Sequence, residues 1–441
     1  MTKIGFVSLG CSKNLVDTEV MLRKLYDAGF EITPDETEAE IIIVNTCGFI
    51  ESAKQESIDN ILDVAKLREW GKCRYIIATG CLVERYREEV MRELPEIDAL
   101  VGVGSLSDIA DACRAVMRGE KYTSFRDKES SELGGERILT TEDYTAYLKI
   151  AEGCDNRCTY CAIPLIRGKL RSRTIEDIVK EAKELEALGV RELNLIAQDT
   201  TRYGLDLYGE YKLAELVREI CKNTSIPWIR LLYCYPDKIT DELIEELRTN
   251  PRLLKYMDIP IQHIADPVLA SMNRHGDGAL IRETVKKLRK KVPGIVLRTT
   301  AMLGFPGESE ADFCELCEFI KEARFDRFGA FTYSPEEDTP AATFEDQIDE
   351  QTKQDRYDAI MQTQLTVAEE LGASRIGKTF EVLCEGFDTV AEIYYGRSYM
   401  DAPDVDGRVY FSSKKKINPG EFVKVKISEA VDYDLVGYTI G

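Results

Sequence analysis

Apolar segments that alternate with amphipathic ones constrain the fold of this chain more than any other feature. In the first part of the sequence, each short apolar segment precedes a stretch with the periodicity of a helix. We predict strands at 3–9, 41–45, 74–79 and 99–103, and helices at 14–28, 51–69, 84–94 and after residue 107. Strands and helices in alternation build a parallel sheet with helices on both faces. Residues 1–125 are therefore predicted to form an open α/β domain.

A second alternation follows a polar stretch, residues 126–143, which we interpret as a linker. Its predicted strands lie at 146–151, 192–197, 228–233, 256–259, 296–300 and 327–332. Six strand and helix units form a TIM-like barrel or an open part of one, a partial (βα)6 barrel. The functional residues of such folds lie at the carboxyl ends of the strands. A long predicted helix at 350–373 ends this domain, which we place at residues 144–373.

The period of the sequence changes after residue 373. Short segments such as 422–426 alternate apolar and polar residues, and Gly and Pro turns separate them. This pattern predicts a small antiparallel β-barrel over residues 374–441. It carries nine basic and eleven acidic residues, so it lacks the strong positive charge of a dedicated RNA-binding domain.

Three cysteines follow the first predicted strand of the second domain in the spacing C-x3-C-x2-C. They are Cys154, Cys158 and Cys161. Four thiolates would close an iron-sulfur cluster, whereas three leave one iron open to bind another molecule. The alternative is that these are packing residues, since free Cys is often buried. Their polar loop, which contains Gly153 and Asn156, favours metal ligation, and the spacing predicts a cluster that takes part in chemistry.

A second group of three cysteines lies in the first domain. Cys11, Cys47 and Cys81 each follow a predicted strand within a residue or two. In open α/β sheets the carboxyl edge of the strands is where ligands bind. A glycine stands beside each thiol, which allows the backbone to pass close to a bulky ligand. We predict a second cluster with one open iron here; the alternative is that the three are ordinary small apolar residues at strand ends.

The amino-acid composition excludes several other kinds of catalytic and metal site. The chain has thirteen Cys but only two His, His263 and His275, which nearly excludes a His-based zinc site or a Ser-His-Asp triad. We find no signal peptide and no apolar run near the ~18 residues of a membrane span, so we expect a soluble, cytoplasmic protein. In that reducing compartment clustered Cys are metal ligands or catalytic groups rather than disulfides. Cys314 and Cys317 lie on the apolar stripe of a predicted helix, and we interpret them as structural.

Charge separates the possible partners. The chain has 79 acidic and 58 basic side chains, a formal net charge of −21. Such a field repels a phosphate backbone and attracts a basic partner. One basic run stands against it, and it either guides an anionic group or forms a solvated face. This run consists of Arg167, Lys169, Arg171 and Arg173.

The first cysteine group, with Tyr160 before its last member, resembles the signature of the radical S-adenosylmethionine superfamily. The resemblance implies a [4Fe-4S] cluster whose open iron binds S-adenosyl-L-methionine and reduces it to a 5′-deoxyadenosyl radical. It also implies that residues at the strand ends hold the cofactor. Our candidates are Tyr160, Gln198, Gln262, Arg298 and Tyr333. Where the superfamily has Gly-Gly-Glu, this chain has Ala197-Gln198-Asp199, which leaves the amine-binding residue open.

The three parts in this order resemble the methylthiotransferase family, whose C-terminal barrel is a TRAM domain. Segments 7–17 and 195–204 are similar to the RimO-type branch, which methylthiolates the β-carbon of an aspartate in ribosomal protein S-twelve. The resemblance implies two [4Fe-4S] clusters, with Cys11, Cys47 and Cys81 holding an auxiliary cluster that carries the sulfur. It further implies a reducing electron donor, and a substrate that is free or part of the small ribosomal subunit.

Two alternatives remain from the sequence. A sister branch of the family modifies adenosine in tRNA, and the net charge of −21 argues against a polyanionic substrate. A non-enzymatic iron-sulfur electron carrier with a binding barrel is the other, and the open iron predicted at both cysteine groups argues against it.

Overall fold

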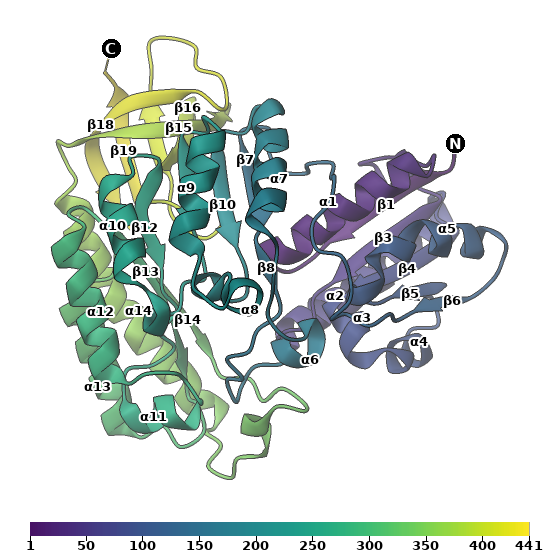
Figure 1. Cartoon of the computed structure of the whole chain (residues 1–441), viewed down its shortest axis with the longest axis horizontal. Helices are drawn as coiled ribbons and strands as arrows, with labels where there is room; N and C mark the ends of the chain where they lie inside the picture. Colours follow the sequence, from purple (N-terminus) through teal and green to yellow (C-terminus); the bar gives the residue numbers. More distant parts are fainter. Residues whose placement is uncertain (441) are drawn as a thin grey trace.

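The computed structural model describes residues 1–440, and its N-terminal part confirms the predicted α/β sheet (Figure 1). All six strands pair in parallel in the order β2-β1-β3-β4-β5-β6. The strands are β1 (Lys3–Ser8), β2 (Glu31–Ile32), β3 (Ile41–Thr46), β4 (Tyr75–Gly80), β5 (Ala99–Val101) and β6 (Tyr122–Ser124). The helices are α1 (Ser12–Asp27), α2 (Glu51–Trp70), α3 (Cys81–Tyr86), α4 (Glu88–Glu93) and α5 (Ile109–Met117), with 3-10 turns at η1 (Glu36–Glu38) and η2 (Val103–Asp108).

Strand β3 shows why the central strands could be predicted. Ile42 and Val44 face one apolar core, and Ile41 and Ile43 face the core on the other side of the sheet. A parallel strand covered on both faces is a continuous apolar run, which is what the sequence contains there. The edge strands β2 and β6 were not predicted, because they have two and three residues and no buried position. The helix predicted at 84–94 is two helices, with a break at Arg87, whose φ is +41°.

The second part is an open sheet of six parallel strands in the order β14-β13-β12-β11-β10-β7. Its strands are β7 (Thr145–Lys149), β10 (Glu192–Ile196), β11 (Trp228–Leu231), β12 (Leu253–Asp258), β13 (Val296–Leu303) and β14 (Arg327–Thr332). Its longer helices are α7 (Ile175–Ala187), α9 (Leu213–Asn223), α10 (Asp241–Thr249), α12 (Gly278–Lys291), α13 (Glu310–Ala323) and α14 (Glu350–Ala373). This confirms the partial (βα)6 barrel, and Figure 1 shows its helices along one face of the sheet.

Shorter elements complete the second part. They are α6 (Ile163–Arg167), α8 (Leu205–Tyr208), α11 (Asp266–Ser271), the paired strands β8 (Ala151–Glu152) and β9 (Arg171–Ser172), and the turns η3 (Thr200–Arg202), η4 (Pro236–Lys238) and η5 (Pro340–Thr343). Several helices begin where a side chain accepts a hydrogen bond from the first turn, which fixes their start. These capping residues include Thr174, Asp277, Ser309 and Asp349.

The C-terminal part is a closed barrel in the strand order β15-β16-β17-β19-β18. The strands are β15 (Thr379–Asp388), β16 (Ile393–Ser398), β17 (Val409–Ser412), β18 (Phe422–Val431) and β19 (Asp434–Thr439). Four of its five strand pairs are antiparallel, as predicted, and β17 pairs with β19 in parallel. Gly441, the last residue of the predicted barrel domain, lies outside the described residues.

The barrel packs on the amino ends of the central strands. Trp228, Leu254 and Val296, at the starts of β11, β12 and β13, share one apolar cluster with the barrel interior. The loop after β16 extends to strand β7, where Asp404 accepts a hydrogen bond from Tyr147 at 2.9 Å. The N-terminal domain packs near the carboxyl ends of the strands, where the cysteine loop lies. Among residues 1–440, no helix is both long and apolar enough to span a bilayer.

Candidate functional site

The first cysteine group lies in the loop between β8 and α6, beyond the carboxyl end of β7. The loop is held by backbone hydrogen bonds, from Cys154 N to Gly168 O at 3.1 Å and from Cys161 N to Cys158 O at 3.0 Å. Gly153 has a φ of +79°, and a Cβ there would lie 1.9 Å from the carbonyl oxygen of Lys169. Only glycine fits at this close approach, so the sequence of the loop fixes its path.

The three thiols of this loop lie in one electrostatic environment. The pKa of Cys154 is raised to about 11, mainly by burial, and the nearby Asp199 and Cys158 contribute to the shift. Burial also holds the pKa of Cys161 well above its usual range, with Cys158 and Cys154 adding to the effect. Three thiolates gathered in one loop repel each other, as the mutual effects of Cys154, Cys158 and Cys161 indicate. A metal cluster would supply positive charge to offset that repulsion, so this donor set fits one.

Aromatic rings surround the cysteine loop. The ring of Phe305 makes edge contacts with Tyr160 at 6.4 Å and with Tyr333 at 5.2 Å between centroids. Tyr235 Oη lies 3.5 Å from Cys158 Sγ. A cavity of about 440 Å³ opens beside these rings and is lined by Tyr160, Met302 and Tyr333 together with Phe49 of the N-terminal domain. An organic cofactor bound here would be shielded from water on several sides.

The second cysteine group converges from three loops of the N-terminal domain. Cys11 precedes α1, Cys47 follows β3 and Cys81 opens α3. At Gly10, whose φ is +88°, a Cβ would lie 2.8 Å from Cys47 Cβ and 2.9 Å from Cys47 Sγ, so the first two loops touch. Burial raises the pKa of Cys47 to about 12, and Cys81 and Cys11 both add to this shift. The three thiols therefore lie in one neighbourhood, where the sequence analysis expects a second cluster.

Neither group is built for a single metal ion. Within residues 1–440, no three side chains of His, Cys, Asp or Glu are close enough to hold one ion together. Thiols that bind separate irons of one cluster stand around it, whereas zinc ligands converge on a single point.

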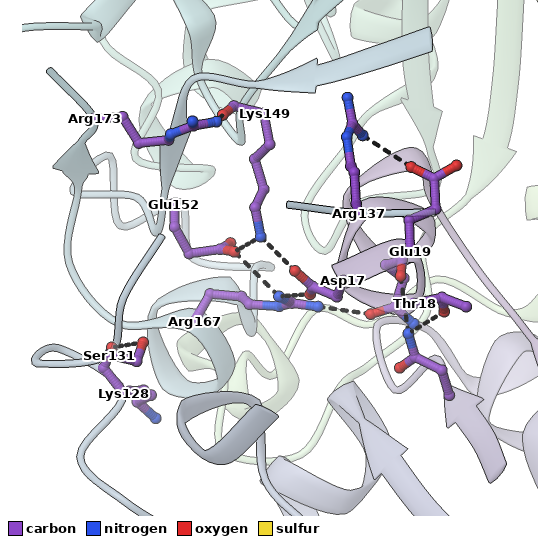
Figure 2. A network of polar contacts seen from close by, with 12 residues as sticks. Asp17, Thr18, Glu19, Lys128, Ser131, Arg137, Lys149, Glu152, Arg167 and Arg173 are labelled. Carbon is purple, nitrogen blue, oxygen red and sulfur yellow. Dashed lines mark hydrogen bonds and ion pairs between the residues drawn. The ribbon is translucent and has the colours of Figure 1, made fainter. Parts of the chain in front are cut away.

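The two cysteine groups meet at the interface between the domains. Cys81 packs against Ala162 and Ile166, which directly follow the first group in the chain. Arg167, at the end of the same helix, donates a hydrogen bond to Cys81 Sγ at 3.3 Å. Figure 2 shows the polar contacts around Arg167 at this interface. Residues far apart in the sequence thus place two sulfur-rich sites side by side.

Comparison with known proteins identifies the family. Residues 3–102 match the uncharacterized protein family UPF0004, residues 148–320 the radical SAM superfamily, and residues 376–440 the TRAM domain. A relative from Desulforamulus reducens, named ribosomal protein uS12 methylthiotransferase RimO, is 50% identical over 444 residues and 99% of both chains. A relative of the same name from Thermoanaerobacter is 49% identical over 438 residues, covering 99% of this chain and all of that one. The chain belongs to the ribosomal protein uS12 methylthiotransferase family.

Solved structures agree with this family at the level of the fold. The radical S-adenosylmethionine methyltransferase TsrM from Kitasatospora setae, solved with cobalamin and a [4Fe-4S] cluster, has a TM-score of 0.55 at 15% identity. The alignment covers 77% of each chain. The predicted fold class and the predicted uS12 methylthiotransferase family are both confirmed.

The residues predicted to bind S-adenosylmethionine lie in different surroundings in the structure. Tyr160 and Tyr333 pack in one apolar cluster with Cys158. Gln198 donates to Glu152, and its own Oε1 is buried without a protein partner, as is Oε1 of Gln262. These two oxygens are free to accept hydrogen bonds from a ligand.

Arg298 lies elsewhere and does not fit the role predicted for it. Its guanidinium pairs with Asp258 at 2.9 Å and Asp406 at 3.4 Å. It lines a cavity of about 520 Å³ that also contains Cys11, rather than the cavity beside Tyr160. Two carboxylates therefore already occupy a side chain that the sequence analysis assigned to S-adenosylmethionine.

Two arginines that the sequence analysis did not assign lie at the cysteine groups. Arg274 stacks over the ring of Tyr235 at 4.0 Å, interacts with Cys158 and has one buried terminal nitrogen without a partner. Arg167 contacts Cys81 in the other group. Arg167 belongs to the basic run noted in the sequence, but no pattern there shows that it points inward. Nothing in the sequence indicates Arg274.

Proposed function

We propose that this chain transfers a methylthio group to the β-carbon of an aspartate in ribosomal protein uS12. The observation that carries the proposal is the full-length match, at 49–50% identity, to relatives named for this activity. The two facing cysteine groups support it, since one site would generate a radical and the other would supply sulfur. The C–H bond of a β-carbon is not acidic enough for a side-chain base, which explains the need for radical chemistry.

The six cysteines would divide between two [4Fe-4S] clusters. Cys154, Cys158 and Cys161 would hold the radical-forming cluster, and Cys11, Cys47 and Cys81 the auxiliary one. When bound, the first cluster and S-adenosylmethionine supply the radical that removes a hydrogen atom, chemistry that belongs to the cofactors. A reducing electron donor is also required. Because the substrate is a ribosomal protein, we place the reaction in the cytoplasm.

The residues of the chain would bind, orient and exclude water. Gln198 and Gln262 are our candidates for accepting hydrogen bonds from S-adenosylmethionine, since each has a buried oxygen without a partner. The rings of Tyr160 and Tyr333 would form the walls that keep water and side reactants from the radical. We withdraw Arg298 from this set because two carboxylates hold it.

The cavity beside Cys11 is our candidate for the entry of the target loop. All three domains line it, with Cys11 from the first, Tyr233 and Asp258 from the second and Asp404 from the barrel loop. Cys11 is exposed, whereas Cys47 and Cys81 are buried. The net charge of −21 would attract a basic ribosomal protein toward this cavity.

Iron content tests the division of the cysteines. Anaerobically reconstituted protein should hold about eight irons, and replacing Cys154, Cys158 and Cys161 by Ala should leave about four, because each group holds its own cluster. Cys314→Ala with Cys317→Ala is the matched control and should keep about eight. A triple variant of the first group that binds no iron would contradict this division.

A competition between substrates tests the assignment to uS12. The matched TRAM domain and the existence of a tRNA-modifying branch make tRNA the second candidate. Purified enzyme should modify uS12, alone or in the small subunit, and leave tRNA in the same reaction unchanged, since the charge of the chain opposes a polynucleotide. Mass spectrometry of both products decides, and modified tRNA beside untouched uS12 would overturn the assignment.

A further inference from the structure

Four charged side chains lie buried at the interface between the first two domains (Figure 2). Asp17 comes from α1, Lys149 from β7, Glu152 from β8 and Arg167 from the end of α6. Each is at most 4% exposed. Two carboxylates face two cations, so the cluster is neutral as a whole. Asp17 is the contribution of the N-terminal domain, and the other three precede or follow the first cysteine loop.

Arg167 makes the most contacts in this cluster. One terminal nitrogen lies 2.5 Å from Asp17 Oδ2 and 3.2 Å from Glu152 Oε2. The other donates to Asn14 Oδ1 at 2.6 Å and to Cys81 Sγ at 3.3 Å. Lys149 completes the cluster by pairing with Glu152 at 2.7 Å and with Asp17. The planar guanidinium thus joins the two domains through four acceptors.

The contact with the Cys81 sulfur is not needed to balance the charges. Asp17 and Glu152 already neutralise Lys149 and Arg167, and buried pairs of this kind need both partners to avoid an isolated charge. The sulfur is an additional acceptor, and it belongs to the cysteine group that faces the radical domain. Glu152 lies two residues before Cys154, so one side chain connects a sulfur of one group to the loop of the other.

We propose that Arg167 is a positioning residue that couples the two clusters. Its hydrogen bond holds the Cys81 ligand against the radical domain, and its fixed positive charge raises the reduction potential of the auxiliary cluster. Reduction adds one electron to that cluster and breaks no bond. A cationic donor at a ligating sulfur favours the more negative, reduced state. The inference rests on the proposed function, because it requires a cluster on Cys11, Cys47 and Cys81.

Arg137 provides a matched control. It is also buried at this interface, where it pairs with Glu19 of α1 at 2.9 Å and with Glu181 of α7 at 2.9 Å. It therefore joins the same two domains with the same chemistry. None of its hydrogen bonds or ion pairs involves a cysteine among residues 1–440. A purely structural role would make Arg137 and Arg167 equivalent.

The test is a redox titration of the full-length chain in which Cys154, Cys158 and Cys161 are Ala, so that only the auxiliary cluster is observed. Electron paramagnetic resonance would follow its reduction. Arg167→Gln should shift the reduction equilibrium about tenfold toward the oxidised state, about 59 mV for one electron. Arg167→Lys retains the charge and should recover most of the shift. Arg137→Gln should leave the potential unchanged.

Each outcome either supports or overturns the role proposed for Arg167. An unchanged potential in Arg167→Gln, or an equal shift in Arg137→Gln, overturns the role of Arg167. If Arg167→Gln binds no iron, then iron retained by Arg167→Lys and Arg137→Gln supports the role, and iron lost from all three overturns it. If the parent with the three Ala replacements binds no iron at all, the proposed function fails, and the inference fails with it.

A second measurement addresses the positioning of the two clusters. In the chain with all six cysteines, Arg167→Gln leaves every ligand of the radical-forming cluster in place. Reductive cleavage of S-adenosylmethionine to 5′-deoxyadenosine should therefore continue while methylthio transfer falls at least tenfold. Equal losses in the two reactions would contradict a role between the clusters.

Discussion

One buried carboxylate, Glu192, contributes to the contact between the C-terminal barrel and the radical domain. Glu192 is fully buried at the start of β10 and interacts with Arg230 from β11 and Arg397 from the barrel strand β16. Arg397 donates to Glu192 Oε2 at 2.6 Å and to Oε1 at 3.1 Å. We predict that Arg397→Met destabilises the protein strongly, because the buried Oε2 of Glu192 then loses its shortest hydrogen bond.

The magnitude follows from the contacts that remain. Arg230 stays on Oε1 at 3.0 Å, whereas Oε2 keeps only the hydroxyl of Thr145 at 3.3 Å. Breaking a buried pair by removing one partner costs about 3–5 kcal/mol of folding free energy. Because Arg230 still neutralises Glu192, we expect the loss in Arg397→Met to be about 3 kcal/mol. Arg248→Met, which removes an exposed pair with Glu245, should cost less than about 1 kcal/mol and is the control.

Tryptophan fluorescence provides a local assay of barrel docking. The chain has two tryptophans, and Trp70 is 67% exposed while Trp228 is 5% exposed and packs against Phe422 of the barrel at 4.8 Å between ring centroids. Urea unfolding of Arg397→Met should show an earlier red shift of the Trp228 signal than the parent protein. A loss of stability no larger than that of Arg248→Met would refute the reasoning.

Three further predictions concern the site and its surroundings. Cys47→Ala should still cleave S-adenosylmethionine reductively but attach no methylthio group to uS12, which product analysis by mass spectrometry would show. Gly153→Ala should lose about four irons, because its methyl group meets the carbonyl of Lys169 at 1.9 Å, whereas Gly29→Ala, with a similar φ and open space, should keep its iron. Burial raises the pKa of Glu308 from 4.5 to about 7, so the stability that its neutral form contributes is present below pH 4.5 and lost as the pH rises through 7. In the parent protein the free energy of unfolding should fall by about 3 kcal/mol across that pH window, and Glu308→Gln should abolish this fall. Thermal unfolding at pH 5 and pH 8 measures the difference. If the variant shows the same pH dependence of stability as the parent, Glu308 is not its source.

Local patterns predicted most of the fold. Continuous apolar runs located the central strands, and β14 has the predicted bounds of 327–332. The parallel pairing of β17 with β19 was missed, because pairing between distant strands leaves no local signal. The stretch 126–143 contains no helix or strand, as expected of a linker, yet it contributes the buried Arg137 to the interface.

The site was predictable to the extent that its chemistry is local in sequence. The two cysteine groups could be proposed from spacing and from their positions after strands. Neither interpretation of the basic run, as a guide for an anionic group or as a solvated face, describes the whole run. Arg167 and Arg173 are buried in ion pairs, whereas Lys169 is exposed. The partner of Arg167, Asp17, is 150 residues away, and no sequence pattern relates the two.

The buried charges inside the open barrel have a consequence for the order of synthesis. Arg327 on β14 is buried and pairs with Asp401, which belongs to the C-terminal barrel. Until the last part of the chain has left the ribosome, this guanidinium has no carboxylate partner inside the protein. Domains fold in order during translation, so the open barrel would wait, partly hydrated, for the C-terminal segment. Truncation near the C-terminus would thus produce a defect in the radical domain, far from the missing residues in sequence.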